Sequence, residues 1–403
     1  MINYISKQIQ TIHKDPVLKI YGLLLSLTHV WTFLYWNKRN FFMNSQSSLN
    51  SEPICFPFFP DCDLFRAQFS PEFWQGILYF YVFSAIFVSL VFLQKKWQAL
   101  AYWGLAFITL FKLGLHLSNY NFMGNYHYMA HFVTLAYLLA PHKKSLIKYL
   151  IIAFYISAGF LKINIDWLSG AAMIRTPYLY GTPLRLSLVY VLFLELIFVF
   201  GLIHPNRKLR YFCLLQFFAF HLFSWHVVGF FYPMVMFSLL GVFYLPEYFD
   251  RKYEPKELLK FISIKEYKSI YIILALFTGL QLLPFTMVDD PSKSGVARLS
   301  SLNMFDSKTS CHSLMVAKTD NGTIHLRPPI KNMGVRLKCD PLVFLNQAHQ
   351  ICRKNKETNE IKELSLHLFT RRVTSSEYKK VLAIKDICSL NNPLWAELED
   401  QES

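Results

Sequence analysis

The chain lacks the short motifs that mark several common classes of soluble enzyme. Its 403 residues contain no phosphate-binding Walker loop, no dinucleotide fingerprint and no Gly-x-Ser-x-Gly nucleophile turn. No Cys-x-x-Cys pair or histidine cluster with complete ligand spacing occurs, so no metal is expected. Internal repeats and a short cleavable signal are missing too, and the first long apolar run, near Val17, is expected to remain as a signal anchor.

What the chain does contain is clustered apolar sequence. It is 53% hydrophobic and 17% aromatic, with a positive mean hydropathy, which is typical of a polytopic membrane protein. The net charge of +15 comes from short basic clusters between apolar runs, with no basic stripe interleaved with aromatics. We therefore expect a lipid bilayer as partner, and no nucleic acid.

About nine apolar stretches approach the ~20 residues that cross hydrocarbon. They lie at 17–36, 74–93, 97–117, 126–141, 145–163, 184–203, 209–229, 230–245 and 268–287. Basic clusters occupy alternate loops, and Lys and Arg are retained on the cytoplasmic side. The expected organisation is a cytoplasmic segment at 1–16, a transmembrane helical domain at 17–288 and an extracytoplasmic domain at 289–403.

The C-terminal segment is predicted to be a small α+β domain. Apolar and polar residues alternate at 313–318 and 363–370, which predicts strands, and the pattern at 340–352 predicts a helix. Six cysteines fall on the predicted outer side, where disulfides can form. A Cys55–Cys62 bridge would pin one loop, whereas a bridge from Cys62 to a tail cysteine would join the domains, and the sequence leaves both open.

A candidate site begins at Lys162, where a membrane-length apolar run ends. An amine kept from water there could act as a base, whereas one that reaches the headgroups would be ordinary flanking charge. At 1.5 Å per residue, His127, His221 and His226 fall at a similar outer depth. Such histidines can equally bond helix carbonyls. Glu195, near the middle of its span, is expected to be protonated or partnered.

Aromatic residues near this depth have two interpretations. Trp167, Trp225 and several tyrosines can form an interfacial belt, or they can wall a pocket for a flat apolar cofactor.

The segment from Tyr155 to Trp167, which contains Ala158-Gly159, Lys162 and Asp166-Trp167, resembles a known family pattern. It is similar to the catalytic-lysine segment of the vitamin K-dependent gamma-glutamyl carboxylases and of the wider horizontally transferred transmembrane (HTTM) domain family. Two further segments, Asn125–Tyr128 and Phe220–Met236, resemble its histidine motifs, and the tail from Arg298 through Phe305 to about Lys385 does so more weakly.

This resemblance implies that Lys162 deprotonates a reduced quinone, either vitamin K or another quinol. Reaction with O2 would then yield a strongly basic species that removes a γ-proton from a peptide glutamate, and CO2 would capture the carbanion. His127 would support quinone binding or oxygenation, and His221 would orient the quinone. The candidates for further quinone contacts are Trp225, His226, Asp166 and Trp167.

The chain departs from the family pattern at two positions. Leu161-Lys162 replaces a lysine pair, and Asn164 replaces an acidic residue of the animal members, whose large outer region is mostly missing here. The peptide substrate is therefore open. The alternative function is a non-enzymatic HTTM protein that binds a lipid, quinone or peptide, because fold alone does not fix chemistry. A transporter would require interrupted half-helices and two matching halves, which the sequence does not show.

Overall fold

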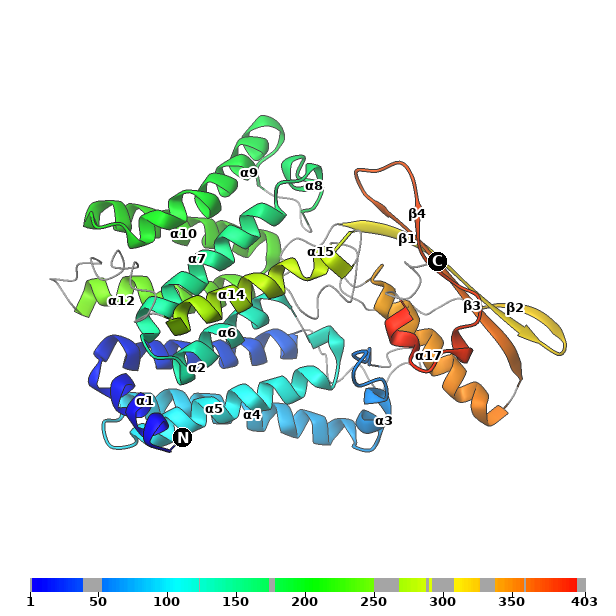
Figure 1. The fold of residues 1–403 in the computed structure, drawn as a ribbon, viewed down its shortest axis with the longest axis horizontal. Helices are drawn as coiled ribbons and strands as arrows, with labels where there is room; N and C mark the ends of the chain where they lie inside the picture. Colours follow the sequence, from blue (N-terminus) through cyan, green and yellow to red (C-terminus); the bar gives the residue numbers. More distant parts are fainter. Residues whose placement is uncertain are drawn as a thin grey trace.

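The protein is a bundle of long helices with a small four-stranded sheet at one end (Figure 1). The computed structural model describes residues 2–38, 53–122, 124–173, 178–249, 268–287, 290–291, 308–326, 338–358 and 360–396. Several sequence features lie outside these residues: Arg175, the basic cluster at 251–265 and the segment from Arg298 to Phe305.

The helices of the bundle begin with one that hydropathy did not predict, an amphipathic helix before the first apolar run. In chain order they are α1 (Ile2–Lys14), α2 (Pro16–Lys38), α3 (Cys62–Ala67), α4 (Pro71–Leu93), α5 (Gln98–Leu117), η1 (Tyr120–Phe122), α6 (Asn125–Leu139), α7 (Lys143–Leu161), α8 (Ile165–Leu168), α9 (Gly181–Leu196), η2 (Phe198–Ile203), α10 (Arg207–Val228), α11 (Phe231–Leu239), α12 (Gly241–Phe249), α14 (Lys268–Leu282) and α15 (Pro284–Met287).

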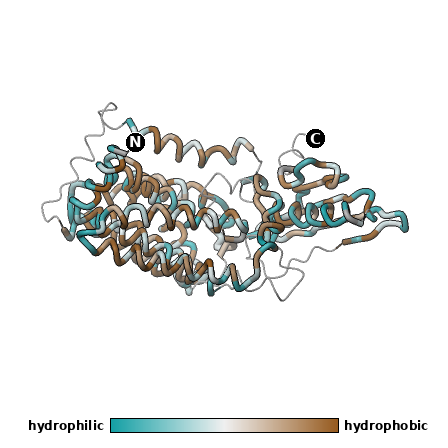
Figure 2. The backbone as a smooth tube through the Cα atoms, turned by 90° about the horizontal axis from the view of Figure 1, so that it is seen from below, coloured by the Kyte–Doolittle hydropathy of each residue, from teal (hydrophilic) through white to brown (hydrophobic). Residues whose placement is uncertain are grey.

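Among the described residues, six helical segments are long and apolar enough to cross a membrane. They are α2, α4, α5, α7, α10 and the continuous segment Lys268–Met287. Hydrophobic residues dominate the bundle helices, and hydrophilic residues gather at their ends and in the C-terminal domain (Figure 2). These features support a membrane-embedded, multi-pass protein in contact with lipid.

The count of about nine spans is not confirmed, because three predicted spans are short or broken. Helix α6 has 15 residues, and α9 ends after 16 residues and continues as the 3-10 helix η2. The stretch expected at 230–245 is divided at Leu240 into α11 and α12, of nine residues each. Hydropathy detects the apolar run in each case and does not detect the break in the backbone.

Buried tyrosines tie the bundle helices together by bonding backbone carbonyls of other helices. Tyr137 Oη donates to Leu18 O at 2.9 Å, and Tyr21 Oη donates to Leu239 O at 3.0 Å. Each bond gives a tyrosine hydroxyl an acceptor inside an apolar core, where an unpaired hydroxyl would destabilise the fold. They connect α6 to α2, and α2 to α11.

The two ends of the bundle differ in chemistry. One end holds the Lys144–Asp15 ion pair at 2.6 Å, together with the amino terminus of α7 and the start of α2. The opposite end carries the C-terminal domain (Figure 1). Two of the basic clusters, at the start of α7 and at the start of α10, lie at the end away from that domain.

The C-terminal domain is an antiparallel sheet, in the order β2-β1-β3-β4, covered by one helix. Its elements are β1 (Thr309–Thr319), β2 (Gly322–Leu326), α17 (Pro341–Thr358), β3 (Ile361–Arg372), β4 (Lys379–Ile384), η3 (Ile387–Ser389) and η4 (Pro393–Trp395). The predicted strands lie within β1 and β3, and the predicted helix corresponds to α17. Leu364, Leu366 and Leu368 alternate along β3 and share a core with α17.

Three disulfides resolve the cysteine pairing. Cys55–Cys62 pins the loop that precedes α3, while Cys311–Cys339 and Cys352–Cys388 close loops inside the C-terminal domain. The covalent link between domains that Cys62 could have made is therefore absent.

Hydrogen bonds and ion pairs join the C-terminal domain to the bundle instead of a disulfide. Tyr120 Oη donates to Asp340 at 3.1 Å, Asn346 Nδ2 donates to the carbonyl of Cys55 at 3.3 Å, and Arg353 pairs with Asp63. These side-chain contacts run from the bundle to the C-terminal domain, so they fix the position of the domain on the bundle.

Candidate functional site

Lys162 is held in a buried ion pair. It is the residue that ends α7, and its Nζ lies 2.6 Å from Glu195 Oε2 and 2.7 Å from Oε1. The side chains are 6% and 0% exposed, so neither charge reaches water. Nζ also donates to Ala158 O at 3.4 Å. The amine of Lys162 therefore neither reaches the headgroups nor lies alone. Glu195 was expected to be either protonated or partnered, and the structure shows it with a partner.

A glycine lets the helices that carry Lys162 and Glu195 pack closely. A Cβ atom built on Gly159 would lie 2.7 Å from Leu196 Cδ2 and 3.3 Å from the Cβ of Glu195, closer than ordinary contact. Glycine at this position therefore lets α9 approach the last turn of α7. The Ala158-Gly159 dipeptide thus has a packing reason that is independent of any chemistry.

Trp167 covers the amine from the next turn of the chain. Asn164 caps the short helix α8 by accepting a hydrogen bond from Trp167 N at 2.9 Å. The indole Nε1 donates to Leu188 O at 3.1 Å, and Lys162 Nζ lies 5.3 Å from the ring centroid. A cation at this distance from an indole face is attracted to it. Trp167 therefore belongs to the lysine site.

Asp166 faces the C-terminal domain instead. It is 2% exposed, and its Oδ2 accepts a hydrogen bond from Arg372 Nη1 at 2.8 Å, while Oδ1 accepts one from Thr374. Arg372 also binds Asp290 through Nη2 at 2.9 Å. One guanidinium from the end of β3 thus binds both Asp166, four residues beyond Lys162, and Asp290, in the short segment after α15. Both carboxylate oxygens of Asp166, a candidate for quinone contact, are occupied by this junction.

His221 belongs to the same buried region as Lys162. Its Nε2 lies 2.7 Å from Tyr155 Oη, and both side chains are fully buried. The ring centroid of Tyr232 lies 5.3 Å from that of His221, and Tyr155 precedes Lys162 on the same helix. The structure therefore assembles a lysine, a carboxylate, an imidazole and two phenols from α7, α9, α10 and α11.

His127 lies in a second buried cluster, near the start of α6. Its ring centroid is 4.8 Å from that of His116, whose Nδ1 lies 3.3 Å from His131 Nε2. Electrostatic interactions extend the cluster to His29 and Lys112. In the part of the chain that the structure describes, no group of three or more His, Cys, Asp or Glu side chains is arranged to hold a metal ion.

Aromatic side chains separate the two clusters. The ring of Phe231 lies 4.9 Å from His127, and that of its neighbour Tyr232 lies 5.3 Å from His221. Within the described residues, neither a hydrogen bond nor an ion pair joins Lys162 to His127. Helix α7 therefore carries both Tyr155, the partner of His221, and Lys162 at its C-terminal end, whereas His127 approaches this region through the aromatic side chains of α11.

Several imidazole nitrogens in these clusters have no bonding partner. Among the described residues, none hydrogen-bonds Nδ1 or Nε2 of His127, or Nδ1 of His221. The two side chains are 1% and 0% exposed, so water does not solvate them from outside. A buried polar atom without a partner is destabilising unless a ligand or ordered water completes it.

The two remaining candidates lie at the end of α10 and have other neighbours. The indole of Trp225 is 42% exposed and its ring centroid lies 6.5 Å from that of Phe230. The ring of His226 stacks on Tyr178 at 3.6 Å. Their roles as quinone contacts stay predictions.

Glu195 and Arg372 are the residues that sequence reasoning did not assign to the site. A carboxylate inside an apolar run signals a partner, but the sequence does not say which one. Arg372 carries no such signal, because an arginine at the end of an amphipathic strand is ordinary.

Comparison of the chain with family models, with curated proteins and with solved structures finds no match. The resemblance to the HTTM family therefore stays a prediction carried by the residues quoted above.

Proposed function

We propose that this protein is a membrane enzyme that abstracts a proton from a reduced quinone and couples its oxygenation to carboxylation of a peptide glutamate. The observation that carries the proposal is the buried Lys162–Glu195 pair beside the Tyr155–His221 pair. A proton-transfer site of this kind works in a water-excluded pocket that a lipid-soluble reactant can enter.

The quinol would supply the reducing equivalents that activate O2, with CO2 as the carboxylating substrate. In the resting ion pair Lys162 Nζ already carries a proton, so it would act as a base only after that proton has left, and it would then accept one from the quinol. Glu195, 2.6 Å away, stabilises the ammonium that this transfer creates. His221, oriented by Tyr155 through Nε2, presents Nδ1 to a polar oxygen, and His127 offers a second buried imidazole. Trp167 keeps water from the amine.

The proposal includes nine spans, with the amino terminus in the cytoplasm and the C-terminal domain outside. The shorter segments α6, α9 with η2, and α11 with α12 pack among the six long ones and supply His127, Glu195 and Tyr232. The two basic clusters that lie away from the C-terminal domain support this orientation.

One observation favours a second candidate, a non-enzymatic membrane protein that binds a quinone, lipid or peptide. Both oxygens of Glu195 and the carbonyl of Ala158 already engage the amine of Lys162. A lysine held in this way can simply neutralise a buried carboxylate and hold two helices together.

The test is turnover in membranes that contain the full chain, supplied with reduced vitamin K, O2, labelled CO2 and a short glutamate-containing peptide. Label in the peptide and quinone epoxide would be measured for the unaltered protein, for Lys162→Ala and for the exposed-loop control Lys96→Ala. Losing a general base lowers the rate by about 10²- to 10⁴-fold, so Lys162→Ala should be nearly inactive while Lys96→Ala stays active.

Two outcomes would contradict the enzyme. One is equal turnover of Lys162→Ala and the unaltered chain; the other is quinone binding by the unaltered chain with no incorporated label, which would favour the binding protein. Thermal unfolding of each purified variant separates loss of chemistry from loss of fold.

A further inference from the structure

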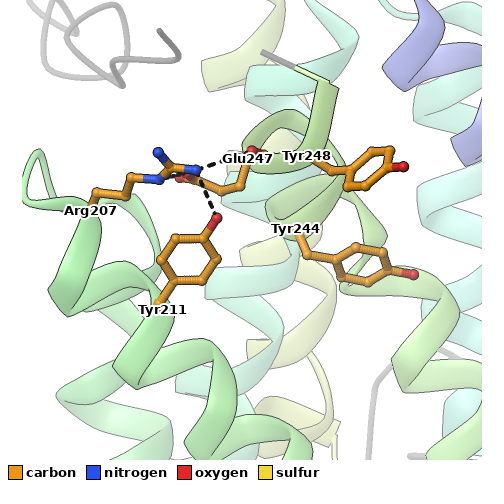
Figure 3. Close-up of a pocket in the computed structure, with 5 residues that line it drawn as sticks. All are labelled: Arg207, Tyr211, Tyr244, Glu247 and Tyr248. Carbon is orange, nitrogen blue, oxygen red and sulfur yellow. Dashed lines mark hydrogen bonds and ion pairs between the residues drawn. The ribbon is translucent and has the colours of Figure 1, made fainter. Parts of the chain in front are cut away.

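A cavity of about 520 Å³ lies at the end of the bundle opposite the C-terminal domain. It is lined by Arg207, Tyr211, Tyr244, Glu247 and Tyr248, from the first turns of α10 and from α12 (Figure 3). Lys162 ends α7, whose first turn lies at the cavity's end of the bundle. The cavity is therefore distinct from the lysine site, and the proposed function does not use it.

Its charged residues hold one another in fixed positions. Glu247 is 5% exposed; it accepts a hydrogen bond from Arg210 Nε and forms an ion pair with Arg207, whose Nε lies 3.1 Å from its Oε2. Arg207 Nη2 donates to Tyr211 Oη at 3.0 Å, as Figure 3 shows. Arg210 is anchored in turn by the carbonyls of His204 and Pro205, at 2.8 and 2.7 Å. The guanidinium of Arg207 is therefore oriented before any ligand arrives.

The cavity keeps hydrogen-bond donors and positive charge that its own residues do not use. Arg207 Nη1 carries two N–H groups for which the described residues provide no acceptor, and the Arg207 side chain is 48% exposed. Two guanidinium groups, those of Arg207 and of the buried Arg210, face the single carboxylate of Glu247. A planar guanidinium with free N–H groups binds phosphate oxygens well.

The surroundings favour a phosphate that belongs to a lipid. Tyr248 is 78% exposed and Tyr211 43%, and tyrosines are enriched at the membrane–water boundary. Along α10, past the cavity, Phe212 and Leu215 are 50% and 63% exposed, which gives an apolar surface for acyl chains. A free anion would gain nothing from this surface.

We propose that this cavity binds the phosphate group of a membrane phospholipid, with Arg207 as its principal donor and the exposed side of α10 against the acyl chains. The excess positive charge favours an acidic headgroup over a zwitterionic one.

The experiment titrates the full-length chain in a neutral detergent with phosphatidylglycerol, with phosphatidylcholine and with inorganic phosphate, and counts bound lipid by native mass spectrometry. Lys208→Ala is the matched control for Arg207→Ala, because it removes an adjacent exposed charge outside the cavity. Losing charge-assisted bonds should weaken phosphatidylglycerol binding about 10-fold in Arg207→Ala, while Lys208→Ala should stay within about twofold.

A third variant tests whether a loss of binding could come from misfolding. Tyr248→Ala alters an exposed wall and leaves the ion pairs intact, and it should weaken lipid binding about threefold. Equal losses in Arg207→Ala and Lys208→Ala would overturn the proposal, because diffuse attraction would then account for binding. Saturable binding of inorganic phosphate without bound lipid would overturn it as well, in favour of a free-anion site.

Discussion

Replacing Glu195 with glutamine tests the central contact of the site. Two unit charges 2.6 Å apart attract each other by about 6 kcal/mol at an effective dielectric constant of ~20. Desolvation offsets much of this attraction, yet removing one partner leaves the other buried and uncompensated. Breaking such a pair costs about 3–5 kcal/mol. Glu195→Gln and Lys162→Met should each lower the free energy of unfolding by about this amount.

The double variant separates pairing from packing. With both charges gone, no buried charge is left uncompensated, so Glu195→Gln/Lys162→Met should be more stable than either single variant, with a loss of about 1–3 kcal/mol from the buried glutamine amide. The assay is reversible unfolding in mixed micelles, followed by tryptophan fluorescence, and Trp167 lies 5.3 Å from the amine. Additive losses, with the double variant as unstable as both single changes together, would refute the ion-pair reasoning.

Two further predictions concern the contacts around this pair. Gly159→Val should push Leu196 away and lower the free energy of unfolding by about 1–3 kcal/mol. Gly114→Ala should be tolerated, because a Cβ atom there meets nothing within 4 Å. Equal losses of stability in the two variants would contradict the argument that α9 approaches α7 closely at Gly159. Arg372→Ala should leave Asp166 without its cationic partner, with only the Thr374 hydroxyl bound to it, and weaken docking by about 2–3 kcal/mol, seen as faster limited proteolysis between bundle and sheet. Arg372→Lys should rescue it only in part, and unchanged cleavage in Arg372→Ala would show that this junction contributes little.

The long helices could be predicted because crossing hydrocarbon requires a run of apolar residues that is visible locally. The sequence also predicted the strands around Val316 and Leu366, since alternation with a period of two is local too. The breaks at Ile197 and Leu240 were missed, because both residues are apolar and the turns depend on how neighbouring helices pack.

Pairings between distant residues were the least predictable part of the site. Burial of Glu195 implies some partner, but Lys162 stands 33 positions earlier and several cations were available. Arg372 and Asp166 are separated by 206 positions, so only the docked domains bring them together. The Cys55–Cys62 bridge was one of two alternatives that spacing alone did not decide.

The pairing of Lys162 with Glu195 also constrains how the chain enters the bilayer. Synthesis proceeds from the amino terminus, so α7 emerges with its amine before the compensating carboxylate on α9 has been made. During that interval the amine has no permanent counter-charge, and its side chain stays near the aqueous boundary or the insertion machinery. Packing of α9 against α7 then neutralises it. The C-terminal end of α7 therefore reaches its final buried environment only after α9 has been made.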